Sequence, residues 1–210
     1  MTRYTVLSVG ELDRIPVSHG LEWRPIRRRL GIRAFGMNAY TAEKVGDCVV
    51  EEHKEGSGHE EVYVVLAGRA TFTLGDEEQD APAGTLVVIR DSSVLRHAVA
   101  AEEGTTVLAV GGKPGVHETS AWEYSFAAYG YLKEGRRERG LEVIREGLAE
   151  RGGDDPRLLY DLACFESLAG DRDEALSNLL RAVEIDDRYR EYAATDTDFQ
   201  AIRDDPRFPR

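Results

Sequence analysis

Short runs of apolar and β-branched residues, each broken by glycine, proline or aspartate, fill the chain between residues 34 and 112. The runs are about 5 to 8 residues long and rich in valine, threonine, tyrosine and phenylalanine, which is typical of strands in an all-β sandwich or barrel. Gly75-Asp76 and the segment from Pro82 to Gly84 supply turns between such runs. Because these connections are short, we predict that successive strands are antiparallel.

The pattern changes after Trp122, where leucine, alanine, glutamate and arginine recur with the period of an α-helix. This second pattern also repeats, since a shift of 35 residues places Ala128 on Ala163 and Leu141 on Leu176. Such self-similarity predicts stacked helix-turn-helix units, as in a helical solenoid.

The two patterns are separated by the segment GGKPGVHETSAW, residues 111–122, which carries glycines and a proline. We therefore predict two domains, an all-β domain over residues 1–120 and an all-α domain over residues 121–210. Residues 1–33 are expected to add an edge strand and a lead-in to the first domain.

Charge narrows the choice of partners. The chain has 39 acidic and 27 basic residues and a net charge of −12. Such a charge repels phosphate backbones and anionic headgroups, so we expect neither nucleic acid nor a membrane surface as a partner. The basic run from Arg24 to Arg33 is an exception, which we interpret as a solvated face, with a local anion site as the alternative.

Cysteine content and hydropathy indicate the compartment. Cys48 and Cys164 are the only cysteines and fall in different predicted domains, which suits a reducing environment without a disulfide framework. The beginning of the chain lacks the apolar core of a signal peptide, and no stretch approaches the ~20 apolar residues that span a bilayer. We therefore expect a soluble, cytoplasmic protein.

The helical domain resembles the tetratricopeptide repeat. In its second unit the family's small and large packing positions are held by Ala163, Gly170, Ala175, Leu179 and Ala182. The first unit has Gly140 and Gly147 where alanines are usual, so we expect it to be the less stable one. The shortened ending resembles the cap of such arrays, with Phe199, Ile202 and Phe208 covering the last helix pair.

The function of this helical segment is open between two hypotheses. Fewer than three full repeats leave most of a concave peptide groove unbuilt, because each unit buries its apolar face only against its neighbours. We favour a segment that packs on the β domain or on a second subunit over a peptide-binding module. Glu166 stands where an aromatic is common, and the acidic surplus makes a basic protein partner more suitable than an acidic one.

Residues 34–112 resemble the cupin superfamily, whose members are small jelly-roll barrels with two sequence motifs. Glu61 and Gly68 keep the final spacing of the first motif, around the run VYVVLAGRATFTL. Pro82-Ala83-Gly84 keeps the start of the second motif, and His97 is the histidine that follows it. The resemblance implies a jelly-roll barrel, a homodimer formed through exposed sheet faces, and a ligand or metal site inside the barrel.

The family's metal ligands are displaced in this chain. The positions where paired histidines are expected before Glu61 fall within residues 54–57 and hold none; His53 lies earlier and His59 later. His97 lies two residues beyond the usual spacing, which Leu95 occupies.

Strand geometry nevertheless groups several of these side chains. Alternation along a strand puts His59, Glu61 and Tyr63 on one face, which is the interior if Glu61 points inward. The predicted ligand pocket is therefore lined by His59, Glu61, Tyr63 and His97. A divalent metal (iron, manganese, nickel or zinc) would be held by His53, His59, Glu61 and His97, since imidazole and carboxylate groups suit such cations.

Two functions of different class follow. The first is a protein that binds a small molecule without catalysis, with the helical segment serving assembly or contact with another protein. The alternative is a metal-dependent enzyme of the dioxygenase, isomerase or epimerase type. We prefer the first because three of the four expected ligands are displaced.

Overall fold

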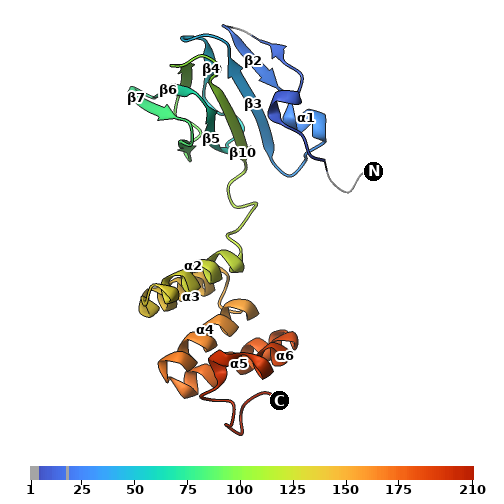
Figure 1. The fold of residues 1–210 in the computed structure, drawn as a ribbon, viewed down its shortest axis with the longest axis vertical. Coiled ribbons are helices and arrows are strands. Elements are labelled where there is room, and N and C mark those ends of the chain that lie inside the picture. Colours follow the sequence, from blue (N-terminus) through green and yellow to red (C-terminus); the bar gives the residue numbers. More distant parts are fainter. Residues whose placement is uncertain (1–4, 18) are drawn as a thin grey trace. The chain divides into compact units, whose positions relative to one another are not determined.

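The computed structural model describes residues 5–17 and 19–210, and the chain divides into two units, Met1–His117 and Glu118–Arg210 (Figure 1). We call them the β unit and the helical unit. The predicted boundary after residue 120 falls in the same segment, just before the first long helix begins at Ala121. No helix in the described ranges is long and apolar enough to cross a bilayer.

The β unit is built from antiparallel strands. They are β1 (Ile15–Pro16), β2 (Leu21–Arg24), β3 (Gly36–Ala42), β4 (Cys48–His53), β5 (Glu60–Ala67), β6 (Arg69–Leu74), β7 (Glu77–Pro82), β8 (Leu86–Ile89), β9 (Arg96–Ala100) and β10 (Thr106–Gly112). A short 3-10 helix, η1 (Val9–Glu11), precedes them, and a five-residue helix, α1 (Ile26–Leu30), follows β2.

The strands form two sheets with the orders β1-β2-β3-β10-β5-β8 and β4-β9-β6-β7. The larger core of the unit lies between them, because buried side chains of both sheets pack in one cluster. Its members include Val65 and Val107 of the first sheet and Phe72 and Ala98 of the second.

Glycines fix two connections, Gly75 through its left-handed backbone conformation and Gly68 also through close packing. Gly75 has φ +61° and turns β6 into β7, as the Gly75-Asp76 pair predicts. Gly68 has φ +69°, and a Cβ there would lie 2.8 Å from the Cα of Thr105. The turn after Pro82 is also present, since the Thr85 amide donates to the Pro82 carbonyl at 3.0 Å.

The segment before β3 covers part of the outer face of the larger sheet. Leu12, Ile26 and Ala39 form a small buried cluster over β3 and β10. The same outer surface is uncovered farther along, where Leu66, Leu86 and Val88 of β5 and β8 are 43%, 61% and 45% exposed. A homodimer through such a sheet face stays a prediction.

The helical unit contains α2 (Ala121–Lys133), α3 (Arg137–Glu150), α4 (Pro156–Ala169), α5 (Arg172–Ile185), α6 (Arg188–Thr195) and the 3-10 turn η2 (Thr197–Phe199). The helices α2 and α4 begin 35 residues apart, as do α3 and α5, which matches the repeat seen in the sequence. Phe199, Ile202 and Phe208 are buried in the same cluster as these helices, as predicted. Membership of the tetratricopeptide family stays a prediction.

Helix α4 is the centre of this unit. It begins at Pro156 after the N-cap Asp155, whose side chain accepts hydrogen bonds from two backbone amides, and it is followed by Gly170 in the left-handed conformation. Every residue from Leu158 to Ser167 is buried. Helix α4 is therefore covered on all sides along this stretch.

Two glycines of α3 allow the helices to approach closely. A Cβ at Gly140 would lie 2.5 Å from Cε1 of Phe165 and 2.9 Å from the backbone oxygen of Ala128. A Cβ at Gly147 would meet the ring of Tyr124 at 2.6 Å. Large aromatic rings thus fill the space that alanine side chains would occupy.

The core of the helical unit also holds an acid. Asp161 of α4 is 7% exposed and accepts a hydrogen bond from Ser125 of α2. Arg157 in turn donates to the Ser125 hydroxyl at 2.9 Å. Burial raises the pKa of Asp161 to about 6, because desolvation penalises the charged carboxylate.

We predict that Gly140→Ala lowers the free energy of unfolding of the helical unit by about 1–3 kcal/mol, because the new methyl group overpacks the contact with Phe165. Gly130→Ala in α2 is the matched control, since nothing lies within 4 Å of a Cβ there. It should raise stability by about 0.5–1 kcal/mol through helix propensity. Urea denaturation followed by circular dichroism measures both, and equal effects of the two variants would contradict the packing described.

Asp161 predicts a pH dependence of stability. Its pKa is raised in the folded state, so its contribution to stability is complete below the unfolded value near 4 and is lost as the pH rises through about 6. The Asp161→Asn variant has no titration at this position. The unfolding free energy of the wild type relative to this variant should therefore fall by about 3 kcal/mol between about pH 4 and about pH 7. A pH-independent difference would show that the carboxyl is not desolvated.

Candidate functional site

Glu61 lies on the inner face of the larger sheet, where the neighbouring strand leaves room for it. It pairs with Gly111 of β10, which in turn pairs with Gly36 of β3. Two glycines in this row remove the side chains that would stand beside the carboxylate. Glu61 and Tyr63, two residues apart on β5, both line one cavity of about 250 Å³.

Arg96 of β9 approaches Glu61 from the opposite sheet. Its side chain is fully buried, and Nη2 lies 3.2 Å from Oε2 of Glu61. Nη1 donates to the backbone oxygen of Ser92 at 3.3 Å, whereas Nε and Nη2 form no hydrogen bond with the described residues. The contact with Glu61 is therefore electrostatic rather than a well-aligned hydrogen bond. Because arginine keeps its proton in proteins, the buried charge requires the carboxylate form of Glu61 beside it.

The phenol side chains of Tyr40 and Tyr63 also line the cavity. Tyr63 donates to Oε2 of Glu61 at 2.9 Å. Burial, and then the charge of Glu61, raise the pKa of Tyr63, and burial followed by Glu51 and Glu61 raises the pKa of Tyr40. Both phenols therefore keep their protons at neutral pH. The Tyr40 hydroxyl makes no hydrogen bond with the described residues, so this group is available to a ligand.

Strand β4 supplies the remaining polar groups. His53 Nδ1 lies 2.6 Å from the backbone oxygen of Glu51, and Nε2 lies 3.9 Å from Oε2 of Glu61. A carbonyl oxygen only accepts, so Nδ1 is the donor, and in the neutral ring Nε2 is an acceptor. The cavity, called here the Glu61 pocket, is lined by Tyr40, Val50, Glu51, His53, Glu61, Tyr63 and Ala109.

The structure brings together only part of the predicted site. His53, Glu61 and Tyr63 line the Glu61 pocket, but His59 and His97 do not. His59 lies in the loop before β5, where its backbone amide donates to Glu55 at 3.0 Å. His97 lines a neighbouring hollow of about 690 Å³, which shares Glu51 and His53 with the Glu61 pocket.

Strand parity explains the position of His97. Ala98 and Ala100 of β9 belong to the core between the sheets, and Arg96 reaches Glu61. His97 therefore faces the other side. Arg96 therefore points inward on β9, where His97 was predicted to do so. Tyr40 and Arg96 were not among the residues predicted to line the pocket or to hold a metal.

A divalent metal does not fit beside Glu61 in this arrangement. Among the residues described, the ligand atoms around Glu61 do not form a group of three within 4.8 Å of one another. The guanidinium of Arg96 is also a fixed positive charge 3.2 Å from the carboxylate. Two unit charges of the same sign about 4 Å apart repel by about 4 kcal/mol at an effective dielectric constant of about 20, and a divalent ion doubles this.

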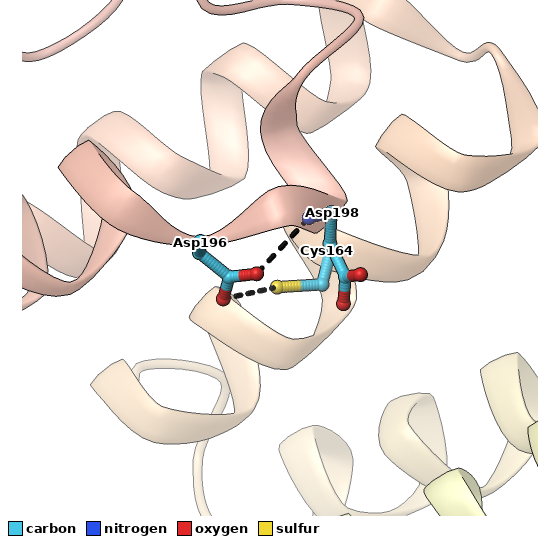
Figure 2. A group of neighbouring side chains, drawn as sticks. All are labelled: Cys164, Asp196 and Asp198. Carbon is cyan, nitrogen blue, oxygen red and sulfur yellow. Dashed lines mark hydrogen bonds between the residues drawn. The ribbon is translucent and has the colours of Figure 1, made fainter.

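A second group of ligand-type side chains lies in the helical unit. Atoms of Cys164, Asp196 and Asp198 lie within 4.8 Å of one another (Figure 2). Burial raises the pKa of the Cys164 thiol, which donates to Asp196 at 3.9 Å. Asp196 also accepts from Tyr160 at 2.8 Å and from the Asp198 amide at 3.0 Å. A protonated thiol is a poor metal ligand, and we interpret the group as a hydrogen-bonded joint between α4 and η2.

Comparison with known proteins gives likeness of structure but no sequence family. No family model matches the chain, and none of the curated proteins searched matches it. A cupin protein from Bacteroides fragilis is similar at 22% identity and a TM-score of 0.43, over 57% of this chain and 92% of that one. A sugar phosphate isomerase from a cupin superfamily of Silicibacter pomeroyi is 16% identical with a TM-score of 0.42, over 52% and 76%.

A third solved structure, PAC13 from Streptomyces with uridine, is 20% identical with a TM-score of 0.39, over 52% of this chain and 82% of that one. Likeness at these identities and TM-scores does not extend to what the matched proteins bind.

We predict that Arg96→Met lowers the unfolding free energy of the β unit by about 3 kcal/mol, because it leaves the Glu61 carboxylate unpaired in a largely buried position. The double variant Arg96→Met, Glu61→Gln should recover most of this loss, since neither charge is then buried. Arg69→Met is the matched control, as Arg69 is 41% exposed and pairs with Asp80 and Glu102 at the surface. Its cost should stay below about 1 kcal/mol.

Chemical denaturation of the three variants measures this coupling. A double variant as unstable as Arg96→Met would contradict the pairing.

Proposed function

We propose that the β unit binds a small polar molecule rich in hydroxyl groups in the Glu61 pocket. Carboxylate and imidazole acceptors stand opposite phenolic donors there, and hydroxyl groups both donate to the former and accept from the latter. The observation that carries the proposal is the buried Arg96, whose Nη2 lies 3.2 Å from Oε2 of Glu61, a residue that lines the cavity. A charge pair of this kind keeps an acceptor aimed at the cavity.

The size and charge of the cavity favour an uncharged ligand. A volume of about 250 Å³ is below the usual range of about 300–1,000 Å³ for ligand pockets, which suits a molecule of monosaccharide size. An anionic ligand would meet Glu51 and Glu61 among the lining residues. The order of the eight strands β3-β10-β5-β8 and β4-β9-β6-β7 supports a jelly roll of the cupin kind as the scaffold.

Non-catalytic binding remains our preferred function. The side chains around Glu61 support it over the metal-dependent enzyme, because His59 and His97 do not line the pocket and Arg96 opposes a cation. For the helical unit we propose a role in assembly or packing, which the complete burial of α4 from Leu158 to Ser167 supports.

Calorimetric titration with a panel of monosaccharides, nucleosides and neutral polyols tests the proposal. At least one compound should bind. The Tyr40→Phe variant should bind this compound about tenfold more weakly, which is the effect of one lost hydrogen bond. Tyr192→Phe is the control, since Tyr192 lies on α6 and is 54% exposed. If no compound binds, or if both variants weaken binding equally, the proposal fails.

Elemental analysis of the same preparation separates the two functions. We expect less than one equivalent of metal. A full equivalent of iron, manganese, nickel or zinc that is lost after His59→Ala and His97→Ala would establish the metal-dependent alternative instead.

A further inference from the structure

We propose a second binding site in the β unit, which takes the phosphate or carboxylate group of a small molecule. It is a hollow of about 300 Å³ lined by Trp23, Arg27, Arg28, Gly31, Ile32, Arg33 and Asn38, called here the arginine hollow. It shares no lining residue with the Glu61 pocket.

The local charge is opposite to that of the chain. The segment from Leu21 to Tyr40 contains five arginines and one acid, Glu22, within a chain of net charge −12. Glu22 is paired with Arg14 at 3.3 Å. Within the described residues, Arg27, Arg28 and Arg33 have no ion-pair partner, whereas arginines of the helical unit such as Arg139 and Arg207 do. The positive charge around the hollow is therefore not neutralised by the protein.

The helix dipole accounts for only a small part of this charge. Arg27, Arg28 and Arg29 lie in the last turn of α1, where a cation is favoured. A complete helix end carries about half a unit of negative charge, and α1 has five residues. The positive charge of three guanidinium groups around one hollow exceeds this partial negative charge several fold. A bound anion would balance the remaining positive charge.

Backbone geometry directs these groups to one place. Gly31 ends α1 with φ +68° and turns the chain so that Arg33 joins Arg27 and Arg28 around the hollow. Arg27 Nε donates to the backbone oxygen of Ile32 at 3.3 Å, which restricts its guanidinium. A partly fixed guanidinium loses less entropy when it binds an oxyanion with two parallel hydrogen bonds.

Trp23 and Asn38 form the uncharged wall. The indole Nε1 donates to Oδ1 of Asn38 at 3.0 Å, which orients the amide so that its Nδ2 is left to donate to a ligand. The flat indole offers a stacking surface for the organic part of that ligand. A small oxyanion with a planar or apolar body is thus the chemistry that this site recognises.

The uncharged wall of the arginine hollow lies on the same sheet face as the Glu61 pocket. Trp23 pairs with Tyr40, and Asn38 pairs with Ala109, and both Tyr40 and Ala109 line that pocket. Helix α1, which carries Arg27 and Arg28, packs through Ile26 against Ala39 on the opposite face.

Fluorescence titration of the full chain at low ionic strength tests the site. A Trp122→Phe background leaves Trp23 as the only tryptophan. The probes are inorganic pyrophosphate, which presents phosphate groups, and citrate, which presents carboxylate groups. At least one probe should change the Trp23 emission saturably. The double variant Arg28→Gln, Arg33→Gln should lower the affinity for that probe by about tenfold or more.

The double variant Arg139→Gln, Arg181→Gln is the matched control, because it removes the same charge from exposed ion pairs of the helical unit. It should leave the affinity nearly unchanged. Saturation by pyrophosphate alone assigns a phosphate ligand, and saturation by citrate alone a carboxylate. Absence of saturation with both probes, or an equal loss in the two double variants, would overturn the site.

Discussion

The ion pair between Arg96 and Glu61 is the constraint on which the β unit and its pocket depend. A guanidinium with no solvent exposure cannot lose its charge, so a carboxylate must stand beside it. The pair joins β9 of one sheet to β5 of the other. It thereby fixes which residues of both strands face inward, because a shift of one residue would turn every side chain to the opposite face. The polar cavity is a consequence of this pairing.

Much of the fold could be predicted from the sequence, because each unit has its own hydrophobic period. Alternating apolar runs predicted most strands, and the 35-residue repeat predicted the paired helices. Strand β7 has no apolar run of its own, because its residues, Glu77–Pro82, are almost all polar and exposed. Only the turn at Gly75-Asp76 indicated that a strand pairs with β6 there.

The site was less predictable than the fold. Glu61 and Tyr63 share an inward face as expected from alternation within one strand. His97 does not join them, since its face depends on where β9 pairs, and β4 beside it has two irregularities of register. Sequence reasoning therefore worked within a strand and failed between strands. The basic run shows the same limit, because its spacing gave no sign that Gly31 would gather the arginines around Trp23 and Asn38.

The two separate hydrophobic cores have a consequence for any measurement of stability. Buried residues of the helical unit form one cluster and those between the sheets another. A chain with two cores need not unfold in a single cooperative step, so one melting temperature would average two transitions. Each unit carries one of the two tryptophans, Trp23 and Trp122. Their emission offers a separate optical report on each half of the molecule.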